Sequence, residues 1–437
     1  MAEIVTLVPL LFVGIDWGSR EHRVVVLDDA GKQIRDWTIE HTGGEIADLV
    51  ERLASLVTNA VARCQIGIEL KSGPIVEALL ERGFPVFAVN PKQTDRFRDR
   101  LMPSGAKDDR RDAFVLATAV RTDSQWLTRL RPTDTRTIEL RAMLRLRDEL
   151  VTDKARLVMR LRAQLWRYYA QMLELADGEL DSRWLWALLE KAPTPKQGAA
   201  LSRAVVARML RDHRVQRLDA DEVRAILKKP SLVVADGVEK AGAIHVRSII
   251  TRLRLLDDQV RAATSDIEQQ LALWSKLATN ESATSASTGS AREPPEDETP
   301  SRCEQRDEVI LRSLPGVGTI TLATLLAEVG EPLGRRDYTA LRALLGVAPI
   351  TRQSGNSRVV VMRRACNEVL RNTAFNWARA AVRYDGRCRA RFAALVARGA
   401  KKPAAYRAVA DHLLRVACSM LRAGTEYDPN HVVRRAA

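Results

Sequence analysis

Short apolar runs separated by turn residues dominate the first 130 residues of the chain. They predict strands over residues 11–18, 23–27, 34–39, 64–69 and 86–89. Amphipathic periodicity predicts helices over residues 46–57 and 75–82, and an apolar run that begins at Ala113 predicts a third. The resulting order, β-β-β-α-β-α-β-α, indicates a mixed α/β domain.

Two long helical patterns follow. The first, over residues 135–175, places apolar side chains seven positions apart at Leu144, Val151, Val158 and Leu165. Arg147 and Lys154 interrupt the second apolar position of this repeat. The second pattern has 4-3-4-3-4-7 spacing through Ile249, Leu253, Leu256, Val260, Ala263, Ile267 and Trp274. The pair indicates a coiled-coil hairpin that also mediates dimerisation or, equally, an ordinary helical bundle.

Composition shifts divide the chain further. Residues 278–306 are rich in Ser, Thr, Pro and Glu and predict a disordered linker. We therefore expect domains over residues 11–130, 134–277 and 307–425, with a tail over 426–437. The segment 177–245 inside the central region reads as helices broken by prolines and a glycine, and its residues indicate no chemistry.

Charge points to a polyanionic partner. The 437 residues carry 69 Lys+Arg against 55 Asp+Glu, a formal net charge of +14. Residues 335–437 hold 21 of these basic residues against 6 acidic ones, so the surplus lies in the last quarter of the chain. A balance of this kind is typical of nucleic-acid binding, and it favours the C-terminal part for phosphate contacts.

Cysteine spacing and hydropathy indicate the cellular compartment in which the protein acts. The five cysteines are widely spaced and form no CxxC pair, which argues against a disulfide framework or a zinc site and fits a reducing cytoplasm. The apolar N-terminus has no basic leader and continues into a strand, so we do not expect a signal peptide. No uncharged stretch reaches the length of a membrane span.

Acidic residues lie at the start of the third predicted helix, just before its apolar run begins at Ala113. The stretch 107–113 reads Lys-Asp-Asp-Arg-Arg-Asp-Ala. On a helix, Asp109 and Asp112 share a face, and so do Asp108 and Asp112. Clustered carboxylates repel each other unless a cation lies between them, and Mg²⁺ prefers such oxygen ligands. The alternative is an ordinary helix N-terminus, where the dipole favours acids.

Two further acids stand at predicted strand ends. Asp16 ends the first strand and Glu69 ends the fourth. Ligands of open α/β sheets collect at such ends. Alone, Asp16 fits a solvated strand end, and Glu69 fits a pair with Lys71. Together with Asp109 and Asp112, they predict a two-metal site whose ions, about 4 Å apart, clamp a phosphodiester.

The basic C-terminal part carries a glycine turn before a helix. Leu-Pro-Gly-Val-Gly over residues 314–318 and the helix over 321–329 predict a helix-hairpin-helix. The backbone N–H groups at Gly316 and Gly318 would then bind a DNA phosphate without reading sequence. A plain helical turn is the alternative.

A serine follows in an arginine-rich loop. Ser354 precedes a glycine and has Arg352, Arg358, Arg363 and Arg364 nearby. Arginine suits a phosphate bidentately, and a serine becomes nucleophilic when a base or an oriented phosphate activates it. Taken alone, a Ser-Gly pair in a loop indicates only a turn.

Together these motifs resemble one family, the DEDD insertion-sequence transposases, which are related to the Piv-type site-specific DNA invertases. The resemblance covers residues 13–120 and 309–419. The first block is similar to the family's RuvC-like domain, which has a ribonuclease-H-like fold. The family's first two acids match Asp16 and Glu69.

The same resemblance assigns the remaining site residues. The family's closing Lys-x-Asp-x-x-Asp-Ala motif matches residues 107–113, which favours Asp109 over Asp108 as the third acid. Lys107, at the start of this motif, is expected to contact nucleic acid. The second block is similar to the family's C-terminal transposase domain. Its Gly-x-x-Pro…Ser-Gly loop places the catalytic serine at Ser354.

The resemblance implies a mechanism and partners. Mg²⁺ ions held by the four acids would activate a scissile phosphate, and Ser354 would attack it to form a phosphoserine bond to DNA. Strand exchange would pass through a Holliday junction in a tetramer built from two dimers. Donor and target double-stranded DNA are the substrates, and members of the family use a bridge RNA as a guide. The acids and the serine would act as a composite site within one chain or across a dimer.

One alternative activity uses only the first block. A RuvC-like, metal-dependent, structure-specific nuclease, such as a Holliday-junction resolvase, would use the acids with water as nucleophile. A non-catalytic nucleic-acid-binding scaffold is a third hypothesis. On the favoured hypothesis the protein is a cytoplasmic bacterial transposase that acts on DNA of the nucleoid.

Overall fold

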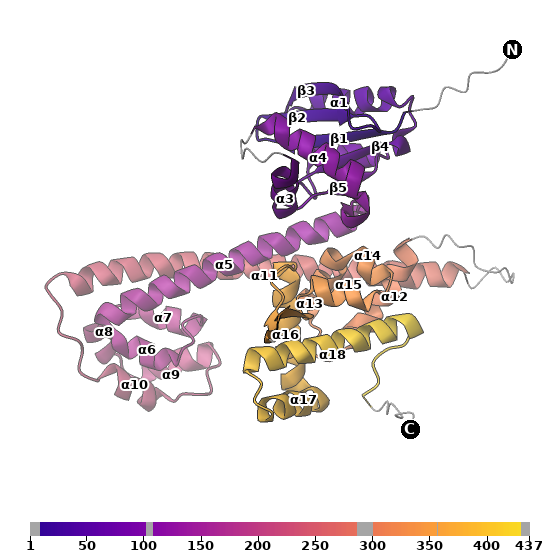
Figure 1. The fold of residues 1–437 in the computed structure, drawn as a ribbon. Helices are drawn as coiled ribbons and strands as arrows, with labels where there is room; N and C mark the ends of the chain where they lie inside the picture. Colours follow the sequence, from indigo (N-terminus) through magenta and orange to yellow (C-terminus); the bar gives the residue numbers. More distant parts are fainter. Residues whose placement is uncertain (1–8, 102–107, 286–299, 356, 430–437) are drawn as a thin grey trace, which may run out of the picture. The chain divides into compact units, whose positions relative to one another are not determined.

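The computed structural model describes residues 9–101, 108–285, 300–355 and 357–429 (Figure 1). The chain divides into two compact units, Met1–Asp134 and Thr135–Ala437. The predicted helical region and the predicted C-terminal domain thus belong to one unit.

The first unit is built on a six-stranded mixed sheet with the order β3-β2-β1-β4-β5-β6. Its strands are β1 (Leu11–Trp17), β2 (Glu21–Leu27), β3 (Gln33–Glu40), β4 (Cys64–Ile68), β5 (Val86–Ala88) and β6 (Thr128–Arg129). Strands β1, β4 and β5 run parallel, whereas β2, β3 and β6 are antiparallel to their neighbours. The five predicted strands are confirmed, and β6 is an addition.

Helices cover both faces of this sheet. They are α1 (Gly43–Leu56), α2 (Pro74–Glu81), α3 (Pro91–Leu101) and α4 (Asp109–Asp123), with single 3₁₀ turns at Val61–Arg63 and Ser124–Trp126. The apolar faces of α1 and α2 pack on one side of the sheet, and α4 packs on the other. Helix α3 was not predicted, because it buries only Thr94 and therefore lacks an apolar stripe.

Two glycines let α4 lie directly on the sheet. A Cβ at Gly14 in β1 would lie 1.8 Å from the carbonyl oxygen of Ala113, and a Cβ at Gly67 in β4 would lie 2.8 Å from that of Leu116. Only glycine permits this approach, since real Cβ atoms do not come within 3.0 Å of backbone. The contact holds the first turns of α4 beside the ends of β1 and β4.

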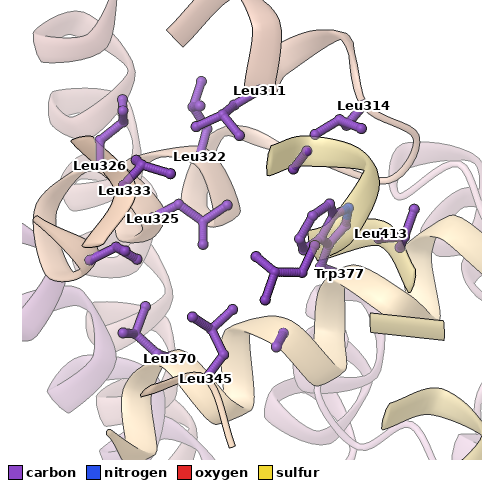
Figure 2. Packing of buried hydrophobic residues seen from close by; sticks show 14 of the residues in the cluster. Leu311, Leu314, Leu322, Leu325, Leu326, Leu333, Leu345, Leu370, Trp377 and Leu413 are labelled. Carbon is purple, nitrogen blue, oxygen red and sulfur yellow. The ribbon is translucent and has the colours of Figure 1, made fainter. Parts of the chain in front are cut away.

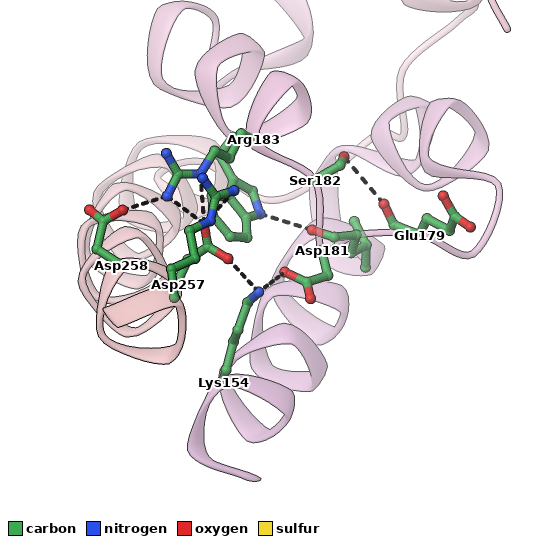
Figure 3. Close-up of polar contacts among 10 residues, drawn as sticks. Lys154, Glu179, Asp181, Ser182, Arg183, Asp257 and Asp258 are labelled. Atoms are coloured by element: carbon green, nitrogen blue, oxygen red, sulfur yellow. Dashed lines mark hydrogen bonds and ion pairs between the residues drawn. The ribbon is translucent and has the colours of Figure 1, made fainter. Parts of the chain in front are cut away.

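Two long helices, α5 (Thr135–Tyr168) and α11 (Val238–Ser285), run antiparallel along each other in the second unit (Figure 1). The predicted heptad repeat is interrupted, because the Val151 side chain is 37% exposed. Instead, Lys154 reaches across and donates a 2.8 Å hydrogen bond to Asp257 on α11, and Arg183 also bonds to Asp257 (Figure 3). The contact between the helices is therefore apolar toward its ends and polar in its middle.

Each end of this helix pair is buried in a different hydrophobic core. Leu161, Leu165 and Leu253 lie in one core together with the short helices of the central region. Leu144 and Ile267 lie in the other, which belongs to the C-terminal helices. This arrangement corresponds more closely to the predicted bundle than to a free-standing coiled coil.

The single helix predicted over residues 135–175 is wrong in one respect. It breaks at Tyr169, whose φ of −136° and ψ of 57° are not helical, and continues as α6. Burial of both tyrosines explains the break, since the Tyr168 hydroxyl donates a 2.9 Å hydrogen bond to the carbonyl of Pro193. The predicted helical segment 177–245 is confirmed. The short helices of this region are α6 (Ala170–Ala176), α7 (Arg183–Lys191), α8 (Pro195–Ala199), α9 (Arg203–Asp212) and α10 (Ala220–Leu227).

The C-terminal helices surround a core that contains Trp377 (Figure 2). They are α12 (Pro300–Ser313), α13 (Thr319–Val329), α14 (Glu331–Gly334), α15 (Tyr338–Leu344), α16 (Glu368–Tyr384), α17 (Gly386–Ala397) and α18 (Lys402–Ala423). A hairpin of β7 (Pro349–Ser354) and β8 (Ser357–Met362) lies between α15 and α16. Both ends of the predicted linker are helical, because α11 extends to Ser285 and α12 begins at Pro300. Residues 286–299 of that linker lie outside the described residues.

We predict that Gly14→Ala lowers the free energy of unfolding of the first unit by ~3 kcal/mol or more, because the new methyl group forces α4 away from β1. Gly44→Ala in the first turn of α1 is the matched control, since a Cβ there meets nothing within 4 Å. Urea unfolding followed by circular dichroism measures both. Equal stability of the two variants would contradict the close packing of α4.

Candidate functional site

Asp16 and Glu69 lie side by side at the carboxyl ends of neighbouring parallel strands. Ile15 of β1 pairs with Ile68 of β4, so Asp16 is the next residue of β1 and Glu69 is the first residue after β4. Side chains alternate along a strand, and Ile15 and Ile68 belong to the core on the α1 and α2 side. Asp16 therefore faces the α4 side of the sheet, and both acids are half-buried.

The first turn of α4 supplies the next acids. Asp108 is the N-cap, and its carboxylate accepts a hydrogen bond from the backbone N–H of Arg110. Asp109 is the first helical residue and is exposed. Both line a cleft of about 450 Å³ together with Asp16 and Trp17. The structure thus brings acids from β1 and α4 together, and it gives Asp108 a capping role that Asp109 does not have.

Asp112 is held differently. It is 5% exposed, and its carboxylate accepts a 2.8 Å hydrogen bond from Nε of Arg98 on α3, whose Nη2 atom lies 2.8 Å from the same oxygen. Arg98 also bonds to Asp95, and its hydrogen bond to Asp112 raises the pKa of the guanidinium. The negative charge of Asp112 is therefore already balanced by an arginine.

Two histidines support the loop that follows Asp16. His22 in β2 is buried, and its Nδ1 accepts a 3.3 Å hydrogen bond from the backbone N–H of Gly18. The Nε2 atom of His22 lies 2.8 Å from Nδ1 of His41. Because Nδ1 accepts, Nε2 carries the proton and donates to His41. Burial, with His41 acting in the same direction, lowers the pKa of His22.

Basic side chains flank the same cleft. Arg23 and Arg110 both line it, and both pair with Asp36 on β3, at 2.6 and 2.7 Å. Within the described residues, no three His, Cys, Asp or Glu side chains converge closely enough to hold a metal ion. Lys107, predicted to contact nucleic acid, lies outside the described residues.

Ser354 ends β7 at the tip of the hairpin and is exposed. Its cross-strand partner is Ser357, and Gly355 in the turn has a φ of +54°, which favours glycine. Side chains two apart share a face of a strand, so Arg352 lies on the face of Ser354. Arg363 and Arg364 follow β8, and the Nε of Arg363 is buried and has no hydrogen-bond partner among the described residues. The backbone of Arg358 pairs with Gln353.

The predicted helix-hairpin-helix corresponds to α12, a tight turn and α13. Gly316 has a φ of +77°, and a Cβ there would lie 2.4 Å from the backbone nitrogen of Ala381 on α16. The same turn is anchored by Trp377, whose Nε1 donates a 2.9 Å hydrogen bond to the Pro315 carbonyl. Gly316 is thus required for packing. Gly318 is the exposed N-cap of α13, with nothing within 4 Å of its Cβ position.

Sequence reasoning missed several residues around the acids. Arg98 is one of several arginines on a helix without apolar periodicity, so nothing in the sequence singles it out. Gly14 and Gly67 carried a usable signal, since a glycine inside a strand often marks a close backbone approach. Nothing in the sequence singled out His22, because its partners, Gly18 and His41, come from a loop and from the residue that follows β3.

None of the helices in the described part of the chain has the length and apolar character that a membrane span needs.

A family described as "Transposase" matches residues 13–170, and the "Transposase IS116/IS110/IS902 family" matches residues 308–393. Asp16, Glu69, Asp109 and Asp112 lie within the first match, and Ser354 lies within the second.

Individual relatives agree with these matches. "Putative transposase y4uE" of Sinorhizobium fredii is 42% identical over 211 residues, 48% of this chain and 58% of its own length. "Mini-circle putative transposase for IS117" of Streptomyces coelicolor is 29% identical over 85% of this chain and 84% of its own length. "Insertion element IS110 uncharacterized 43.6 kDa protein" of the same species is 26% identical over 96% of this chain and 95% of its own length.

We predict that the first unit loses stability as the pH falls below about 6.5, the ordinary pKa of histidine. His22 has a lowered pKa in the folded chain, so the unfolded chain binds a proton that the folded chain excludes. His22→Gln should flatten the decrease of the thermal midpoint between pH 7.5 and 5.5. His245→Gln, at an exposed position on α11, should leave it unchanged. Identical pH profiles for wild type and His22→Gln would refute the prediction.

Proposed function

The chain belongs to the IS116/IS110/IS902 family of transposases, and on that premise we propose that it cuts and rejoins the DNA of an insertion sequence through Ser354. Donor and target double-stranded DNA are its substrates. The observation that carries the proposal is that one chain holds both sets of residues. Acids lie at the ends of adjacent strands and at the start of α4, and an exposed serine lies on a hairpin flanked by arginines.

The acids suit Mg²⁺ of the two-metal type. Asp16, Glu69 and Asp109 would offer carboxylate oxygens, the ligands that Mg²⁺ prefers, and Asp16 and Asp109 line the same cleft. Asp112 would complete the set if its carboxylate released the guanidinium of Arg98 and bound the metal instead. Bound Mg²⁺ supplies charge that stabilises a phosphodiester during displacement.

Ser354 performs the covalent step. Its Oγ forms a bond to phosphorus and loses its proton, while one deoxyribose oxygen leaves the phosphorus and gains a proton. The phosphoserine bond conserves the energy of the phosphodiester, so a deoxyribose hydroxyl of another strand can attack it and restore Ser354. Arg352, on the same face of the hairpin, is placed to contact the phosphate, and Arg358, Arg363 and Arg364 add positive charge to this part of the chain.

The partners follow from charge and family. Helix α17 and the loop that follows it expose Arg387, Arg391, Arg398 and Lys401, which suit phosphate contacts together with Gly318 at the start of α13. Our proposal includes a bridge RNA that pairs with donor and target DNA, and assembly of the chain into dimers that form a tetramer. Strand exchange would pass through a Holliday junction.

A serine exchange separates this proposal from a nuclease that uses water. Ser354→Ala should abolish both recombination and the covalent protein–DNA adduct, which denaturing electrophoresis of end-labelled DNA detects. Ser357→Ala is the matched control, because Ser357 is the cross-strand neighbour of Ser354, and it should retain the adduct. Cleavage that persists in Ser354→Ala without any adduct would favour the RuvC-like nuclease instead.

Adjacent acids on α4 allow a second matched pair. Asp109→Asn should reduce adduct formation at least ~100-fold, because an amide is a poor ligand for a hard divalent cation. Asp108→Asn should leave it within a few-fold of wild type, since asparagine caps a helix as well as aspartate does. The rate of adduct formation in Mg²⁺ measures both. The reverse ranking would transfer the role of third acid to Asp108.

A further inference from the structure

A small cavity of about 180 Å³ lies at the base of the β7–β8 hairpin in the second unit. The loop between α15 and β7, the end of β8 and the helices α16 and α18 line it. Its walls are apolar at Leu345, Val347 and Met362, and the ring of Phe375 also lines it. Arg407 and Asn372 are the polar groups that distinguish it from an ordinary packing defect.

Arg407 lines this cavity without a partner. It is half-buried, and it makes no hydrogen bond or ion pair with the described residues. The usual partner for an arginine on a helix is an acid four residues away, here Asp411. Both oxygens of Asp411 are already used, by the Tyr338 hydroxyl at 2.8 Å and by Arg342 at 3.1 and 2.8 Å. The guanidinium of Arg407 is therefore available to a ligand.

Asn372, which is exposed, also has a side-chain amide that makes no hydrogen bond with the described residues. The other arginine at the cavity, Arg371, pairs with Glu368. The cavity thus carries one uncompensated positive charge, one free amide and one aromatic wall. Phe375 is fixed by an edge-on contact with the ring of Tyr406, at 5.3 Å between centroids.

The size of the cavity restricts the ligand. It is smaller than the ~300 Å³ at which pockets for drug-sized molecules begin. It is several times larger than the ~30 Å³ that a water molecule occupies in the liquid. A single planar ring system fits these limits, with an amide to bond its edge and a guanidinium to contact its face or its phosphate.

We propose that this cavity binds one nucleobase that is unstacked from a nucleic-acid strand. The inference rests on the proposed function, because it takes the strand to be that of the recombining DNA or of a guide RNA. Met362 at the cavity pairs with Pro349, and Ser354 lies five residues farther along the same ladder, roughly 17 Å away. The captured base therefore belongs to a nucleotide several positions from the phosphate that Ser354 attacks, and it fixes the position of the strand on the hairpin.

The test compares base-bearing and abasic strands of equal length. The full-length protein is titrated with fluorescent oligo-dT and with an abasic oligodeoxynucleotide, and in a second arm with oligo-U and its abasic counterpart. The ratio of the two affinities reports base contacts, because the backbone charge is the same in both strands. We expect Arg407→Gln and Phe375→Leu each to lower this ratio by about tenfold in the arm that matches the bound strand.

Arg398→Gln is the matched control, since it removes the same charge from an exposed residue outside the cavity. It should weaken both strands equally and leave the ratio unchanged. Ratios in Arg407→Gln and Phe375→Leu equal to that of wild type would overturn the nucleobase site, even if Ser354-dependent adduct formation is intact. A wild-type protein that binds neither strand and forms no adduct would overturn the proposed function together with this site.

Discussion

The close contact between α4 and the two central strands is the constraint on which the first unit depends. Gly14 and Gly67 have no side chains, and the backbone of α4 occupies the space that their Cβ atoms would take. The contact brings residues that are almost a hundred positions apart in the chain to one edge of the sheet. Without it, Asp109 and Asp112 would have no defined relation to Asp16 and Glu69.

The charges at this edge are balanced by arginines. Arg98 neutralises Asp112, and Arg23 and Arg110 share Asp36 beside the cleft. Buried carboxylates require such partners, because an unpaired charge of low exposure is costly. These contacts give each of the two carboxylates a counter-charge from a neighbouring element.

In the second unit, the elements that stabilise the fold differ from the hairpin that carries Ser354. Its apolar cores bury both ends of the α5–α11 pair, while Lys154, Arg183 and Asp257 define the register in its middle (Figure 3). The β7–β8 hairpin, by contrast, exposes side chains on both faces, including Val359 and Val360. A two-stranded hairpin gains little stability from itself, so this element is typical of a surface that is completed by a ligand.

The sequence by itself determined the strands of the first unit, the helix that begins after Asp108 and the helical character of the remainder. These features depend on hydrophobic periodicity and on helix capping, and residues close together in the sequence determine both. The sequence also singled out Asp16, Glu69, Asp109 and Asp112 as acids at element boundaries. Only the tertiary structure decided that Asp112 pairs with Arg98, that Gly316 packs on α16 and that Arg407 has no partner among the described residues. Each of these depends on how separate helices pack on one another, and local pattern holds no information about such packing.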